Sequence, residues 1–176
     1  MLALFAAACG GSDGEDETGG DATPALTAAD LLPDLSASGF SLVQSGRVPA
    51  AAESQDANFA IYARQGAVSQ ARVEVNMHPT PDAAAAQFGA IAEALRNPPP
   101  DLFGPNATQT DNEAIFQADQ SRSYVTTKPD GQGNLVYTDA YRFGRAVVIV
   151  YVIGNDQQAA SETRQDIAEQ IPKNGS

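Results

Sequence analysis

An unbroken apolar stretch rich in β-branched residues covers residues 146–153 and reads Ala-Val-Val-Ile-Val-Tyr-Val-Ile. This stretch is too short to span a bilayer as a helix, and its β-branched side chains favour a strand. Because both faces of the strand are apolar, it is predicted to lie in the middle of a sheet, covered on each side. The rest of the fold is expected to pack around it.

Two helices are predicted, over residues 81–96 and 156–171. The first begins with Thr-Pro-Asp at 80–82, which supplies a capping hydroxyl, a proline at the first helical position and an acid in the first turn. It ends before the three prolines at 98–100. The second follows a Gly-Asn-Asp turn at 154–156. Its inward face is formed by Ala160, Thr163, Ile167 and Ile171.

Further strands are predicted at residues 39–48, 58–63, 71–77, 114–117, 121–127 and 135–143. The clearest of them, 71–77, reads Ala-Arg-Val-Glu-Val-Asn-Met, and this strict alternation indicates one core face and one solvent face. Strands followed by a capped helix occur twice along the chain. This order favours an α+β fold, an antiparallel twisted sheet with both helices packed on one face, although the sequence does not fix the strand order.

The composition narrows the choice of partners. The chain has 176 residues, of which 43% are apolar, enough for one domain with one core. Its formal net charge of −12 argues against nucleic acid or an anionic lipid surface as a partner, since both repel an acidic protein. Much of this charge belongs to the N-terminal segment, because several acids precede the first basic residue, Arg47. Five of these acids lie within residues 13–21, namely Asp13, Glu15, Asp16, Glu17 and Asp21.

The N-terminal segment contains the only cysteine, which excludes an intramolecular disulfide. Apolar residues 2–8 run into Cys9, and the sequence at 6–9 is Ala-Ala-Ala-Cys. It resembles the end of a bacterial lipoprotein signal peptide, in which small residues directly precede a lipidated cysteine. The basic residues that begin such a peptide are absent, so the translation start is expected upstream of Met1. Residues 1–8 would then be the remnant of a signal peptide.

The segment after the cysteine, residues 10–21, contains no apolar side chain. It has no burial to offset the entropy lost on ordering, so it is predicted to be disordered. A flexible chain of about 15 residues spans roughly 20 Å on average. The predicted organisation is therefore a lipidated Cys9 with an acidic tether over residues 9–25, followed by a single α+β domain over 26–176.

The lipoprotein resemblance implies that Cys9 carries lipid on its sulfur and an acyl group on its new amino terminus. One acyl chain anchors a protein only marginally, whereas several chains on one residue make the attachment durable. The domain would then be extracytoplasmic, in the periplasm or on the outer face of the cell envelope. By the same resemblance, Gly10 after the cysteine is compatible with sorting to an outer membrane.

Candidate chemistry in the chain is sparse. His78 is the only histidine and the only side chain whose ordinary pKa lies near neutrality, but the sequence has no Gly-x-Ser-x-Gly turn to accompany it. One His and one Cys cannot supply a usual zinc ligand set, and the acids at 111–113 lack the spacing of a calcium loop. The Gly-Gln-Gly at 131–133 reads as a hairpin turn and not as a phosphate loop. No metal or cofactor is predicted, and His78 is interpreted as a loop residue.

Aromatic residues gather on the last two predicted strands, and most of them are interpreted as core. A more specific hypothesis is a groove for a hydrophobic ligand or a partner segment, formed with the proline-rich connection. Its candidate residues are Leu102, Phe103, Tyr137 and Tyr141.

These features predict a membrane-anchored, extracytoplasmic lipoprotein that binds an envelope protein or a hydrophobic small molecule without catalysis. Two alternatives stay open. One is an envelope hydrolase using His78, which requires a carboxylate or hydroxyl within hydrogen-bond reach inside a concave pocket. The other is a structural or assembly lipoprotein without a ligand.

Overall fold

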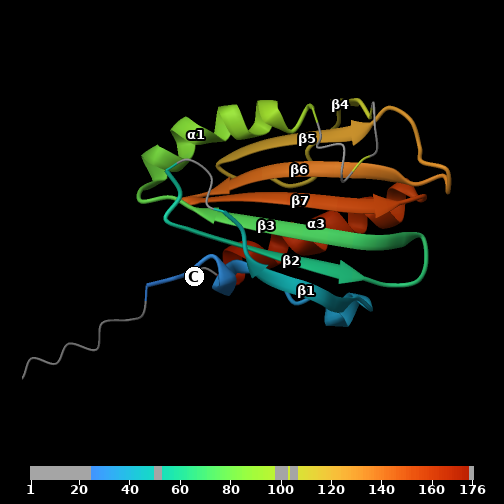
Figure 1. Cartoon of the computed structure of the whole chain (residues 1–176), viewed down its shortest axis with the longest axis horizontal. Helices are drawn as coiled ribbons and strands as arrows, with labels where there is room; N and C mark the ends of the chain where they lie inside the picture. The colour runs from blue at the N-terminus through green and yellow to red at the C-terminus, as the bar shows by residue number, and fades with distance from the viewer. Residues whose placement is uncertain (1–24, 50–52, 98–102, 104–106, 175–176) are drawn as a thin grey trace, which may run out of the picture.

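The computed structural model describes residues 25–49, 53–97, 103 and 107–174. It contains a seven-stranded antiparallel sheet in the order β1-β2-β3-β7-β6-β5-β4, with helices packed against it (Figure 1). The strands are β1 (Ser41–Arg47), β2 (Asp56–Ala63), β3 (Val68–Met77), β4 (Gln109–Asp111), β5 (Gln120–Thr126), β6 (Leu135–Phe143) and β7 (Ala146–Gly154). The predicted α+β class and antiparallel sheet are confirmed.

The apolar run that forms β7 occupies the fourth position of the seven, as its sequence predicts. It pairs with β3 on one side, where Val150 faces Val73, and with β6 on the other, where Val150 faces Asp139. Nearly all of its side chains are buried on both faces. A strand in this position has every backbone group paired to a neighbour and needs no polar face.

The two main helices are α1 (Pro81–Ala94) and α3 (Gln157–Asn174). Their predicted caps are present: the Thr80 hydroxyl accepts from the Ala83 backbone N–H at 3.1 Å, and an Asp156 carboxylate oxygen accepts from the Ala159 N–H at 2.8 Å. Each cap satisfies a backbone donor that the first helical turn leaves without a partner.

The expectation that both helices share one face of the sheet is wrong, because they lie on opposite faces. Successive residues of a strand point to opposite faces. The cluster beneath α1, around Phe88, contains from β7 Val147, Ile149 and Tyr151. The cluster beneath α3, around Ile167, contains from β7 Val148, Val150 and Val152.

The two faces are covered to different extents. On the α3 face, the helix is joined by two short 3-10 helices, η1 (Ala29–Leu31) and η2 (Ser36–Ser38), and the larger core extends from β2 to β6. On the other face, α1 contacts β5, β6 and β7. Where α1 does not cover the sheet, β3 carries Arg72 and Glu74, which form an ion pair and are only partly buried. The polar residues that alternate along this strand therefore lie where α1 no longer covers the sheet.

One strand prediction near the far edge is wrong, and one strand there was not predicted. The expected strand at 114–117 is absent, and the chain there is irregular. The edge strand is instead β4, whose Thr110 pairs with Val125 of β5. The apolar residues of the irregular segment serve the core from a loop, since Phe116 packs edge-on against Tyr141 with 6.2 Å between the ring centroids. Apolar content alone does not separate a strand from a loop that contributes to the core.

A buried ion pair joins α3 to the sheet. Arg164 is 1% exposed and Asp139 of β6 is fully buried, and two guanidinium nitrogens donate to the two carboxylate oxygens, each at 2.6 Å. Arg164 also donates to the Ser123 hydroxyl of β5 at 2.7 Å. Burial disfavours the charge of Arg164, but the hydrogen bonds and charge of Asp139 outweigh it and raise the pKa of the guanidinium. The pair fixes α3 across β5 and β6.

Candidate functional site

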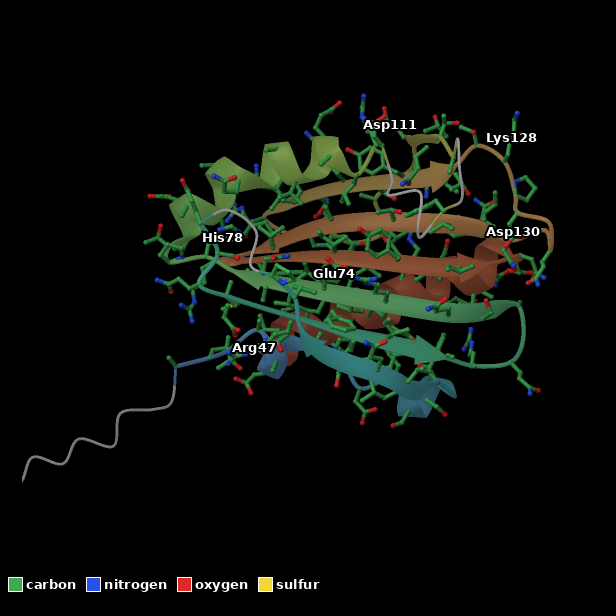
Figure 2. The ribbon with its side chains drawn as sticks, viewed as in Figure 1. Arg47, Glu74, His78, Asp111, Lys128 and Asp130 are labelled. Carbon is green, nitrogen blue, oxygen red and sulfur yellow. The ribbon has the colours of Figure 1, made fainter. Side chains whose placement is uncertain are left out.

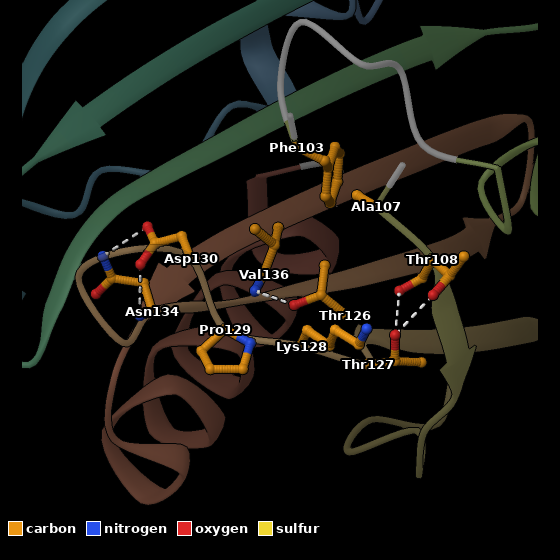
Figure 3. A pocket seen from close by; sticks show the side chains of 10 residues that line it. All are labelled: Phe103, Ala107, Thr108, Thr126, Thr127, Lys128, Pro129, Asp130, Asn134 and Val136. Carbon is orange, nitrogen blue, oxygen red and sulfur yellow. Dashed lines mark hydrogen bonds between the residues drawn. The ribbon is translucent and has the colours of Figure 1, made fainter. Parts of the chain in front are cut away.

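A pocket of about 350 Å³ opens where β5, β6 and the segment before β4 meet (Figure 3). We call it the distal pocket. Its volume lies at the lower end of the range typical of small-molecule sites. It is lined by Phe103, Ala107, Thr108, Thr126, Thr127, Lys128, Pro129, Asp130, Asn134 and Val136.

The apolar part of the distal pocket is formed by Phe103 and Val136 (Figure 3). The Phe103 ring meets Tyr151 of β7 edge to face, with ring centroids 5.9 Å apart and an interplanar angle of 70°. This is a favourable arrangement of two aromatic quadrupoles. Phe103 is nevertheless only half-buried, so part of its ring is available to a ligand.

Hydroxyl groups form the polar rim. The Thr126 hydroxyl oxygen accepts from the Val136 backbone N–H at 3.0 Å, which leaves its own proton free to donate. The Thr108 and Thr127 hydroxyl oxygens lie 2.6 Å apart, and Thr127 also donates to the Thr108 carbonyl at 3.2 Å. These bonds hold the end of β5 against the segment that leads into β4.

Lys128 supplies the positive charge of the distal pocket. Its side chain is exposed and makes no hydrogen bond or ion pair with any residue in the described part of the chain. The nearby Asp130 carboxylate is occupied, because it accepts from Asn134 and from the Gln132 backbone. The Asn134 side chain and backbone donors lower the pKa of Asp130. The turn therefore engages the acid and leaves the ammonium group available.

This arrangement can bind and orient a small molecule, but it carries no nucleophile paired with a base. An acidic group would meet Lys128 and a hydroxyl donor, while an apolar portion would contact Phe103 and Val136. Among the described residues, no group of three or more His, Cys, Asp or Glu side chains is arranged to hold a metal ion.

Of the predicted groove residues, the structure places Phe103 in the distal pocket, while Leu102 lies outside the described residues. Tyr137 and Tyr141 are on the opposite face of the sheet, in the core beneath α3. Phe103 and these two tyrosines therefore do not form one groove. Cys9, the residue predicted to carry lipid, also lies outside the described part.

The buried tyrosines fit the interpretation of the aromatics as core. Tyr141 is fully buried and packs against Phe116 and Phe143. Burial raises the pKa of Tyr141, and the nearby charge of Asp139 raises it further. Burial likewise raises the pKa of Tyr137, which lies beneath the Arg164 guanidinium at 5.5 Å. Both hydroxyls stay neutral at physiological pH, and the buried Tyr141 hydroxyl is inaccessible to a ligand.

His78 is fully buried at the end of β3, so the expectation of a loop position holds only for its backbone. Neither ring nitrogen has a hydrogen-bond partner among the described residues, and His78 lines none of the pockets described. Burial lowers the pKa of His78, and the backbone and charge of Glu53 oppose this only in part. The geometry required of a catalytic histidine is thus not formed by these residues.

The polar half of the distal pocket was not found by sequence reasoning. Thr126, Thr127 and Lys128 directly precede the Pro-Asp-Gly turn. This position is the end of a strand, where side chains gather at the rim of a sheet. It was the available sequence signal for a site at these residues. The pairing of β4 with β5, which brings Thr108 beside Thr127, had no signal in the sequence.

The fold and the pocket define an α+β domain with a central antiparallel sheet, one of the two main described helices on each face and a small polar-rimmed pocket at one end. No family model and no curated protein matches the chain. Among solved structures it is similar to the extracellular domain of PknH from Mycobacterium tuberculosis, with a TM-score of 0.57 and 14% identity. The match covers 83% of this chain and 95% of that one. At this identity the likeness concerns the fold alone.

None of the helices in the described ranges combines the length and the apolar character needed to cross a membrane.

Proposed function

We propose that this chain is a lipid-anchored, extracytoplasmic lipoprotein whose domain binds a small ligand in the distal pocket without catalysis. The lipobox-like sequence ending at Cys9 supports the anchor, and the acidic segment after it supports a tether. The shared fold with a domain described as extracellular supports the location.

The observation that carries the binding role is the position of the distal pocket relative to the tether. The described chain begins at Ala25, beside Arg47 and Arg145. We call this end of the sheet the tether end. Strand β6 starts at Leu135 near the distal pocket and finishes at Phe143, next to the tether end. Nine residues of strand separate the two ends by roughly 30 Å.

Figure 2 shows the same separation, with Arg47 and His78 at one end of the molecule and Lys128 and Asp130 at the other. A domain anchored through the tether end would hold the distal pocket away from the membrane and open to solutes. The ligand class that fits is a small molecule with one acidic group for Lys128 and an apolar ring or short chain for Phe103.

The anchor is tested by replacing Cys9 with serine in the chain expressed with its complete upstream signal. We expect the unaltered protein to be in the membrane fraction with an intact mass increased by several acyl chains. The Cys9→Ser protein should lose the added mass and leave the membrane fraction entirely, because no other anchor is proposed. An unmodified Cys9 in protein recovered from the cytosol would contradict the proposal.

The pocket is tested with Phe103→Ala. Ligand binding, screened as the rise in melting temperature with a panel of small aromatic and aliphatic carboxylates, should be lost. The melting temperature without ligand should change little, because Phe103 is only half-buried. Phe59→Ala is the matched control, since Phe59 is also half-buried but lies on β2, outside the pocket. If both variants bind the ligand equally well, the distal pocket is not the binding site.

A further inference from the structure

A second cavity, of about 380 Å³, lies at the tether end between the β6–β7 turn and the last turns of α3. Most of its lining is apolar. The side chains that form it include Leu26, Leu31, Met77, Phe143, Ala146 and Ile171. The lining is formed by segments far apart in the sequence that meet at this end of the sheet. Figure 1 shows that the described chain begins and ends at this end of the sheet.

An adjoining hollow of about 290 Å³ shares Leu26, Met77 and Arg145 with this cavity and adds Arg47. The two hollows therefore form one site with an apolar part and a part lined by two guanidinium groups. Arg145 uses one nitrogen to donate to the Leu26 carbonyl at 2.8 Å. Arg47 is exposed and has no hydrogen bond or ion pair with any described residue.

The one carboxylate in the lining, Asp56, is already engaged. It accepts from the Ala28 backbone N–H at 2.8 Å and from the Asn58 side-chain amide at 3.2 Å. The bond from Ala28 holds the start of the described chain against β2. The two arginines outnumber this single carboxylate. The lining of the site is therefore locally positive, although the net charge of the chain is −12.

We infer that this site binds one acyl chain of an anionic amphiphile, with the chain in the apolar cavity and the acidic head at Arg47 and Arg145. An apolar cavity next to two cations is complementary to a long-chain carboxylate or phosphate, in which the same two groups are joined. A fully polar anion would leave the apolar cavity unused, and an uncharged chain would leave Arg47 unpaired.

The site is also close to a source of such molecules. Fifteen residues lie between Cys9 and Ala25, and a flexible segment of this length spans roughly 20 Å. The tether end would therefore lie near the membrane surface. This nearness rests on the proposed anchor, whereas the cavity and its two arginines do not. The amphiphile could be a free fatty acid or a membrane phospholipid, which share the same chemistry.

The experiment uses the full chain with Cys9→Ser, so that no lipid of its own competes. Titration with dodecanoate should show one bound molecule per chain, and butyrate, which has the same head without the long chain, should bind far more weakly. Arg47→Gln should weaken dodecanoate binding about fivefold, the effect of one cation near an anionic head. Arg122→Gln, which removes an exposed arginine of β5 distant from this site, should leave it unchanged.

Vesicles of phosphatidylcholine with and without phosphatidylglycerol separate the two sources. Binding of dodecanoate alone identifies a free fatty acid, and binding of both dodecanoate and the anionic vesicles identifies a membrane lipid. If the protein binds the anionic vesicles but not dodecanoate, the interaction is electrostatic attraction to the vesicle surface and no acyl chain enters the cavity. This result would overturn the inference.

The distal pocket provides a further check. Dodecanoate binding that is lost in Phe103→Ala and intact in Arg47→Gln would overturn the inference while leaving the proposed function standing. Loss in Arg47→Gln with normal binding in Phe103→Ala supports the inference whatever the distal pocket binds.

Discussion

Replacing Arg164 with alanine is expected to lower the free energy of unfolding by about 3–5 kcal/mol. The substitution leaves the Asp139 carboxylate fully buried without its partner and removes a donor from Ser123. An uncompensated charge in the core is far more costly than the loss of an exposed pair. The measurement is urea unfolding followed by circular dichroism.

Arg96→Ala is the matched control for this prediction. Arg96 also forms an ion pair, with Asp111, but these side chains are 47% and 73% exposed. Solvent screening limits such a pair to about 0–1 kcal/mol. A similar loss in the two variants would mean that Asp139 finds water or another partner. The double variant Arg164→Met, Asp139→Leu should recover most of the stability, because it removes both buried charges together.

Truncating the core on either face of the sheet is expected to have the second largest effect. Phe88→Ala removes the ring that α1 buries, at about 3–5 kcal/mol, and Ile167→Ala opens a cavity beneath α3, at about 2–5 kcal/mol. Because the two residues lie on opposite faces, their costs should be independent. Unfolding of the milder Phe88→Leu and Ile167→Val variants and their combination measures this, with additivity expected within about 0.5 kcal/mol.

The comparison pair for this cycle is Ile167→Val with Val150→Ala, two changes in the single cluster beneath α3. Here the combined cost should depart from the sum, since neighbouring side chains relax into the same cavity. If Phe88 and Ile167 instead prove coupled while this pair is additive, the two-layer arrangement of the helices is incorrect.

Much of the fold was predictable from local signals. The apolar run of β7 indicated the centre of the sheet, and the Thr80 and Asp156 caps marked both helices close to their observed starts. These signals are local because a cap or a strand period involves residues only a few positions apart. The same run also contained the information that the helix prediction missed, since a strand buried on both faces requires cover on both faces.

The candidate site was less predictable. Phe103 was singled out, but it was grouped with Tyr137 and Tyr141, which point to the other face. Reading that difference requires the exact register of β6 against β7, because a shift of one residue exchanges the faces. Lys128 drew no notice in the sequence because a lone exposed lysine is ordinary. Its proposed role in ligand binding depends on the ammonium group having no partner among the described residues, which only the surrounding geometry reveals.

Most of the elements could be predicted from the sequence, as could the central strand, the acidic leading segment and the resemblance to a lipoprotein signal, because each involves residues that are neighbours along the chain. The tertiary structure alone decided that the helices cover opposite faces, that Arg164 reaches Asp139, and that two hollows lie at opposite ends of β6. These features join residues far apart in the chain, and their formation depends on strand order and register.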